Sequence, residues 1–154
     1  MASPEELVSF TEHFYELERA LLETRKRPVS YAGVILYDNE AHTLAQIAQK
    51  EGISQRELSQ RMFRTKGATS LVVDKLVEKG LVIRTPHENR RLLTLTELGW
   101  QVQRQRMENE LRRANEMVEE MPVDMDQLAV ANQVMDAIVR YQREKYKESL
   151  EEQK

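Results

Sequence analysis

The apolar pattern of the sequence changes its period at Gly80, and this change constrains the fold more than any other feature. Before it, residues 66–79 repeat apolar side chains at helical spacing. After it, two short β-prone runs, 81–85 and 92–95, enclose the polar stretch 86–91, which is predicted to be a six-residue turn. The predicted core face of the helix consists of Val72, Val73, Leu76 and Val77. A helix that leads directly into a hairpin predicts a mainly α fold with a two-stranded β-hairpin.

Two shorter helices are predicted before residue 66. The first occupies residues 40–50, and the second begins where Ser54 and Glu57 have the spacing of a capping box. Thr65 is placed to cap the third helix. The order helix, helix, helix, hairpin over residues 40–96 is typical of a winged helix-turn-helix.

Long amphipathic helices are predicted on both sides of this unit, and residues 148–154 are expected to fray. They carry more apolar residues than the winged unit alone could cover, which favours a homodimer. An intramolecular bundle is the alternative. The predicted organisation is one compact domain with three parts: an N-terminal helical dimerisation segment at 1–38, a winged helix-turn-helix unit at 39–96 and a C-terminal helical dimerisation segment at 97–154.

The composition excludes several classes of protein. The 154 residues include no cysteine, so disulfide frameworks, thiolate zinc sites and thiol redox sensors are excluded. The longest apolar run, at 34–37, is too short to span a bilayer. The N-terminal residues resemble an amphipathic helix and not a secretory signal, so a cytoplasmic location is expected.

The charge is distributed unevenly, although the net charge is only −3. Residues 1–53 hold five Lys or Arg and nine Asp or Glu, and residues 92–154 hold nine and thirteen. Residues 54–91 reverse this balance, with nine basic and four acidic side chains. A basic middle between acidic flanks indicates a nucleic-acid-binding module. The alternative is chance clustering of solvated charge.

The winged helix-turn-helix pattern assigns positions to DNA contacts. The 66–79 helix would enter the major groove, and the side opposite its predicted core face carries small or basic residues near the N-terminus. Basic residues before this helix suit backbone phosphates, and two arginines at the hairpin tip suit a neighbouring minor groove. The predicted DNA-binding residues are Arg61, Arg64, Thr65, Lys66, Gly67, Ser70, Leu71, Asn89, Arg90 and Arg91.

The stretch ELSQRMFRTKGATSLVVDKLVEKGLVIR, followed by NRRLLTLTELG, resembles the MarR family of winged helix-turn-helix regulators. The runs at 76–82 and 95–99 carry most of the resemblance. It implies a homodimeric transcription regulator, a repressor, that binds double-stranded DNA at a pseudo-palindromic site. The family usually has Asp-x-Arg at the wing tip, whereas this chain reads HENRR over 87–91, so Glu88 or Asn89 would have to brace the arginine. The wing also looks short by a few residues, and Leu71 lies where polar residues are common.

The resemblance further implies a small-molecule effector site between the dimerisation helices and the winged unit. The polar side chains that could line it are Tyr15, Tyr31, Tyr37 and His42. The alternative is that these polar tips simply reach solvent. The seven methionines could also line such a pocket, or could fill the core.

The sequence carries no catalytic motif and no cofactor motif. It lacks a glycine-rich phosphate loop and a nucleophile elbow, so no enzymatic activity and no cofactor are expected. His13 with Glu16, or His42 with Glu40, could contribute to a metal site, but the spacing matches no ligand motif and no metal is expected. The main alternative function is a winged helix used for protein–protein contact without DNA binding, and an enzyme of unrecognised type is the second alternative.

Overall fold

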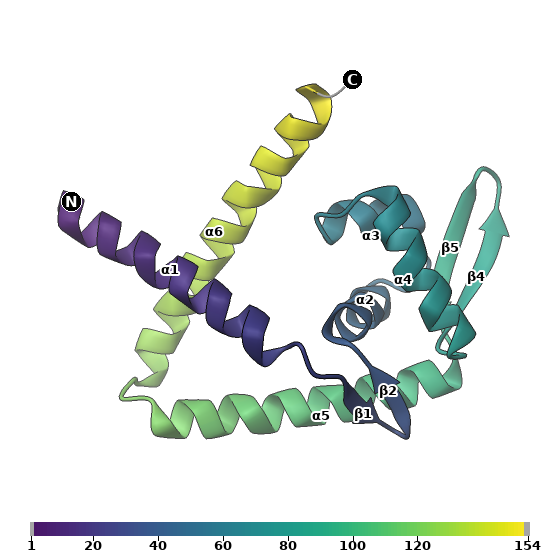
Figure 1. Cartoon of the computed structure of the whole chain (residues 1–154), viewed down its shortest axis with the longest axis horizontal. Helices are drawn as coiled ribbons and strands as arrows, with labels where there is room; N and C mark the ends of the chain where they lie inside the picture. Colours follow the sequence, from purple (N-terminus) through teal and green to yellow (C-terminus); the bar gives the residue numbers. More distant parts are fainter. Residues whose placement is uncertain (1, 153–154) are drawn as a thin grey trace.

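A computed structural model describes residues 2–152 of the chain, which form a mainly helical fold with two small antiparallel sheets. In Figure 1 the winged unit lies above α5, and α1 and α6 extend away from it. The elements in chain order are α1 (Pro4–Thr24), β1 (Val29–Tyr31), β2 (Val34–Leu36), α2 (Asp38–Gln49), β3 (Ile53–Ser54), α3 (Gln55–Arg61), α4 (Lys66–Glu78), β4 (Val82–His87), β5 (Arg90–Leu95), α5 (Glu97–Glu120) and α6 (Met125–Glu152).

The predicted fold class is confirmed, because a helix-turn-helix of α3 and α4 leads into an antiparallel wing of β4 and β5. The sheet has the order β3-β5-β4, with Ile53 opposite Leu93 and Val82 opposite Leu95. The short strand β3 is an addition that the sequence did not predict. It ties the start of α3 to the wing.

The helix ends follow local capping chemistry. The Ser3 hydroxyl accepts a hydrogen bond from the backbone N–H of Glu6, and the backbone N–H of Ser3 donates to the Glu6 carboxylate, so the two residues form a complete capping box at α1. Thr96 caps α5 in the same manner by accepting from the N–H of Gly99 at 2.9 Å. At α6, Asp124 and Gln127 cap each other reciprocally. The predicted starts of these helices are therefore confirmed.

The core lies wholly within the winged unit, the β1–β2 hairpin and the first turns of α5. It draws side chains from every one of these elements, and its fully buried members include Leu36, Leu44, Ile47, Ile53, Leu58, Val73, Leu76, Leu81, Leu93 and Val102. Gly99 allows α5 to pack closely, because a Cβ at this position would collide with the carbonyl oxygen of Leu81. The glycine that ends the run at 95–99 is therefore required for the packing of α5 against Leu81.

A buried ion pair joins α2 to the end of α4. Lys79 places its Nζ 2.7 Å from Oε2 of Glu40 and 2.9 Å from the carbonyl oxygen of Ile35. The same Glu40 carboxylate accepts the backbone N–H of Tyr37 at 2.8 Å and is only 2% exposed. Three elements, the β1–β2 hairpin, α2 and α4, are thus fixed to one another by polar contacts.

The wing is longer than the sequence predicted. The six-residue turn predicted at 86–91 is wrong, because β4 continues to His87 and pairs with Arg90, which leaves a turn of Glu88 and Asn89. Pro86 is tolerated because β4 is an edge strand, where a missing N–H costs no bond to a further strand.

Two smaller predictions also need correction, and one hairpin was not predicted. Residues 29–36 form this hairpin, in which Ala32 and Gly33 take positive φ values of 48° and 79° between β1 and β2. Val77 is 37% exposed and does not join the core face of α4, whereas Thr69 is buried there beside Val72, Val73 and Leu76. The predicted fraying at 148–154 is wrong up to Glu152, where α6 ends, and residues 153–154 lie outside the described residues.

Candidate nucleic-acid interface

Helix α4 presents a small, basic and apolar face to solvent at its N-terminal end. Thr65 caps the helix by accepting a hydrogen bond from the N–H of Ala68 at 3.2 Å. Lys66 and Gly67 are exposed, and a Cβ at Gly67 would meet nothing within 4 Å. Leu71, farther along the helix, is 67% exposed. This face can approach another surface closely.

The wing places two arginines beside its turn. Arg90 lies opposite His87 and Arg91 lies opposite Pro86, and both are exposed. Glu88 takes a φ of 50° in the turn, and among the described residues no ion pair joins it to Arg90. Their guanidinium groups are therefore available for other contacts.

An open concavity of about 790 Å³ lies between the wing and the two helices of the helix-turn-helix. Four basic side chains and one acidic side chain line it. The acid, Glu57, forms an ion pair with Lys50. We call this concavity the basic basin; its lining residues are Ser54, Gln55, Arg56, Glu57, Gln60, Lys66, Asn89, Arg90 and Arg91. The basin can accept a polyanion because its positive charge exceeds its negative charge.

The structure brings only some of the predicted DNA-binding residues to this basin. Lys66, Asn89, Arg90 and Arg91 line it, and Ser70 is half-buried farther along α4. Sequence reasoning missed Arg56, which lies on α3. Arg56 could have been predicted only from the strand β3, which brings the start of α3 beside the wing. This strand spans only two residues, so the sequence pattern did not reveal it.

Arg61 and Arg64 lie outside the basin. Arg61 contacts Oε1 of Gln49 at 3.4 Å. Arg64 lines a different cavity, of about 620 Å³, that faces Leu17 of α1 and Met135 of α6. Their positions on either side of the turn before α4 are as the sequence predicted, but they do not join the other basic side chains.

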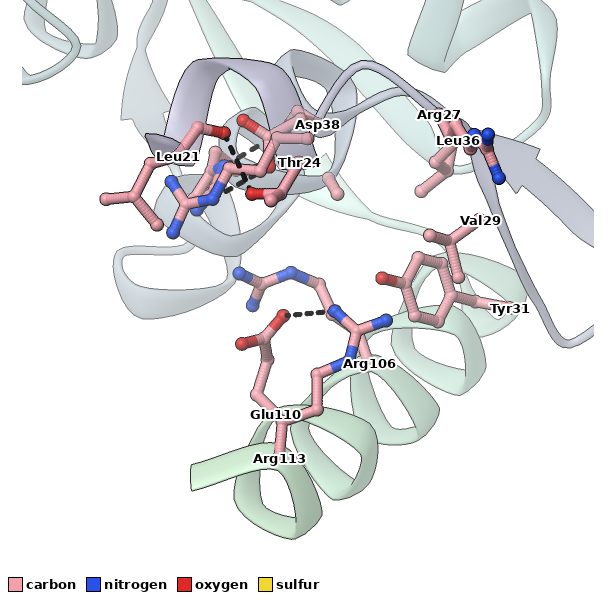
Figure 2. A pocket seen from close by; sticks show the side chains of 13 residues that line it. Leu21, Thr24, Arg27, Val29, Tyr31, Leu36, Asp38, Arg106, Glu110 and Arg113 are labelled. Carbon is pink, nitrogen blue, oxygen red and sulfur yellow. Dashed lines mark hydrogen bonds and ion pairs between the residues drawn. The ribbon is translucent and has the colours of Figure 1, made fainter. Parts of the chain in front are cut away.

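A third cavity, of about 460 Å³, lies between the end of α1, the β1–β2 hairpin, α2 and α5, and we call it the arginine cavity. Figure 2 shows the side chains of Tyr31, Arg106 and Arg113 extending into this space. Its apolar wall is formed by Leu21, Val29, Leu36 and Ala41, and its charged groups are Arg25, Arg27, Asp38, Arg106, Glu110 and Arg113.

Acidic partners offset part of the positive charge in the arginine cavity. Asp38 lies 3.9 Å from Arg25 and 3.3 Å from Nδ1 of His42, and Glu110 lies 3.9 Å from Arg113. Four arginines face two carboxylates, so the cavity carries an excess of positive charge.

The four residues predicted for an effector pocket are divided between sites. Tyr31 and His42 line the arginine cavity together. Tyr37 lines the neighbouring cavity that also contains Arg64. Tyr15 lines neither of these two cavities and packs edge-on against Phe14 with the ring centroids 6.3 Å apart.

Within residues 2–152 no group of three or more His, Asp or Glu side chains is arranged to hold a metal ion. In the same part of the chain, none of the helices combines the length and the apolar character that crossing a bilayer requires.

A family model matches the middle of the chain. The sequence model of the MarR family matches residues 36–93. No curated protein matches the chain in sequence.

Solved structures share the fold over most of the chain. A MarR family protein from Bacillus stearothermophilus has a TM-score of 0.67 at 19% identity, covering 92% of this chain and 99% of its own. Streptococcus pneumoniae FabT in complex with DNA has a TM-score of 0.62 at 17% identity, covering 91% and 94%. Staphylococcus aureus MarR in complex with salicylate and kanamycin has a TM-score of 0.64 at 18% identity, covering 87% and 85%. The chain is therefore similar to the MarR family over residues 36–93, and most of it shares the fold of these solved structures.

Proposed function

We propose that this protein is a sequence-specific, DNA-binding transcription regulator that acts as a homodimer. The observation that carries the proposal is the basic basin, which joins the N-terminal end of α4 to the wing. The complex of FabT with DNA supports it, because that protein has the same fold. A protein–protein module would not need four basic side chains around one open concavity.

In the proposed complex, α4 lies in the major groove. Lys66, Ser70 and Leu71 face base edges, and Gly67 allows the helix to approach closely. Arg56 joins the backbone contacts, since it lies on the first helix of the motif. Arg61 and Arg64 keep the proposed phosphate role from their positions beside the turn, and Thr65 orients the helix end.

The proposed homodimer follows from the exposed apolar face of the terminal helices. Leu17 is 49% exposed on α1 and Met135 is 45% exposed on α6. Two winged units related by a two-fold axis would bind a pseudo-palindromic site with half-sites about 34 Å apart. The boundaries 39 and 96 remain our proposed limits of the winged unit, since Asp38 begins α2 and Thr96 caps α5.

Lys66→Ala tests the placement of α4. Duplexes selected from a random library would be titrated with each variant by fluorescence anisotropy. We expect the variant to lose about 1–3 kcal/mol of binding free energy and to change the preferred bases. Arg61→Ala and Arg64→Ala should weaken all duplexes alike, with a salt slope lower by about one unit for each lost phosphate contact.

Lys147→Ala is the matched control for Lys66→Ala. Lys147 is exposed on α6 and pairs with Glu144, far along the chain from the basin. Its removal should leave affinity and preference unchanged. If Lys66→Ala behaves like this control, α4 is not the recognition helix, and if the wild-type protein binds no duplex, the protein–protein alternative is favoured.

We further propose that the protein is a repressor whose DNA binding is modulated by a small anionic effector in the arginine cavity. The excess of arginine and the apolar wall beside Tyr31 suit an aromatic acid. The salicylate complex of the S. aureus relative supports this ligand class. We propose no catalytic activity and place the protein in the cytoplasm, where a bacterial chromosome lies.

Salicylate is the probe for this cavity. Isothermal titration should detect its binding to the wild-type protein and weaker binding to Arg106→Gln, because Arg106 lines the cavity and no ion pair to it is found in the described residues. Equal binding to both proteins would refute the placement of the effector.

A further inference from the structure

The C-terminal part of α6 touches the turn that leads into α4. Tyr146 donates a hydrogen bond from its hydroxyl to the backbone carbonyl oxygen of Arg64 at 3.1 Å. Its ring meets Phe63 edge-on, with the centroids 5.4 Å apart. Arg143, one turn earlier on α6, holds its guanidinium carbon 5.0 Å from the centroid of the Phe63 ring. Residues 80 to 83 positions apart in the chain are thus joined by three contacts of different kinds.

The turn that receives these contacts has an unusual backbone. Phe63 takes a φ of 53°, in the left-handed region that bulky residues rarely adopt, so the conformation costs free energy. Phe63 is 39% exposed, and the partners described for its ring come from α6. Contacts to Phe63 and to the Arg64 carbonyl therefore act directly on the strained residue of the helix-turn-helix and on its neighbour.

The position of the turn explains why these contacts bear on DNA binding. Arg64 is followed by Thr65, the cap of α4, and then by Lys66, its first residue. A shift of the Arg64 backbone therefore moves the start of the proposed recognition helix. The other end of the connection is α6, which has no buried residue and carries part of the proposed dimer face.

We propose that Phe63, Arg143 and Tyr146 form a latch that fixes the orientation of α4 relative to α6, and that Tyr146 is a positioning residue for DNA binding. This inference rests on the proposed DNA-binding role of α4. In a dimer, the latch would hold each recognition helix at a defined position relative to the helices that join the two protomers. Without it, the winged unit samples other orientations, and DNA selects the competent one at a cost in affinity.

Tyr146→Phe removes the hydroxyl and retains the ring. One intramolecular hydrogen bond has a modest net value, so we expect the dissociation constant to rise by about three- to tenfold for all duplexes, with the same base preference. Tyr141→Phe is the matched control, because Tyr141 is 60% exposed on the same helix and its ring lies near Lys145. The control should bind DNA as the wild type does.

A distance measurement separates positioning from plain stabilisation. The chain has no cysteine, so Lys75→Cys on α4 and Gln142→Cys on α6 provide two unique sites for spin labels, both at exposed positions. The labelled chain is diluted with unlabelled chain, so that distances within one protomer dominate the signal. We expect one narrow distance distribution in the otherwise wild-type protein and in Tyr141→Phe, and a broad one in Tyr146→Phe.

The two readouts keep the latch and the DNA-binding proposal apart. A broad distribution in Tyr146→Phe supports the latch even if the wild-type protein binds no DNA, a result that would overturn only the proposed function. An unchanged narrow distribution overturns the latch, whatever happens to affinity. A lower melting temperature with an unchanged distribution also overturns it, because Tyr146 would then only stabilise the end of α6.

Discussion

The winged unit and the terminal helices of this protein solve the problem of apolar burial in different ways. The winged unit places Leu44, Leu58 and Leu76 at 0% exposure in one shared core. In contrast, α1 has 21 residues and α6 has 28, and neither helix contains a buried residue. This difference indicates that the winged unit is stabilised by its own buried core, whereas the terminal helices have an apolar face that another surface must cover.

The largest expected effect breaks the assembly and leaves the core intact. Leu17→Arg places a charge on the apolar face of α1, and Ile138→Arg does the same on α6, so a dimer interface would have to bury an unpaired charge. We expect each variant to change the mass measured by light scattering from dimer to monomer at micromolar concentration. Circular dichroism should still show a cooperative transition of the winged unit.

A control and a contrary result define this test. Glu12→Arg changes a charge on the same helix at an exposed polar position, and it should leave the dimer intact. A monomeric wild-type protein would favour the intramolecular bundle as the way in which these faces are covered.

A smaller effect is expected inside the winged unit, at the Glu40–Lys79 pair. Lys79→Met leaves the carboxylate of Glu40 buried without its partner and should lower the free energy of unfolding by about 3–5 kcal/mol. Glu40→Gln should cost less, because the side chain of Lys79 is 30% exposed and can be solvated. Urea unfolding of both variants measures the difference, and equal losses would show that burial of Glu40 is not the cause.

This ion pair also shows why the sequence predicted some features and missed others. Helix starts were predictable because Ser3, Thr65 and Thr96 act on residues three positions away. The partner of Glu40 lies 39 positions away, and no local pattern reveals it. Sequence reasoning therefore treated Glu40 as a possible metal ligand, whereas it is a structural anion.

The wing shows the same limit for a strand. Polar residues between two apolar runs predict a turn, but the pairing of His87 with Arg90 extends both strands past those residues. The pairing between the strands, and not the polar composition of residues 86–91, therefore determines where the two strands end. The candidate site was predictable at Lys66, Arg90 and Arg91, while Arg56 joins them only through the packing of β3 against β5.

The smallest expected effect distinguishes the two arginines of the wing. Arg91 lies on the same face of β5 as the buried Leu93 and Leu95, because alternate side chains of a strand share a face. Arg90 lies on the opposite face, at the position next to the turn. The brace from Glu88 is not needed for this assignment. We expect Arg90 to reach the minor groove from the tip and Arg91 to contact phosphates along the α4 side.

On this view Arg90→Ala costs about 1.5 kcal/mol, the lower end for hydrogen bonds to a charged group, on duplexes with A·T-rich flanks. The loss should shrink on G·C-rich flanks, where the minor groove is wider and its potential less negative. Arg91→Ala should weaken both duplexes equally and reduce the salt slope. Anisotropy titrations of the two variants against both duplexes measure these losses. A flank-dependent loss at Arg91 and not at Arg90 would reverse the assignment, and it would mean that the twist of the wing turns its inner face toward the groove.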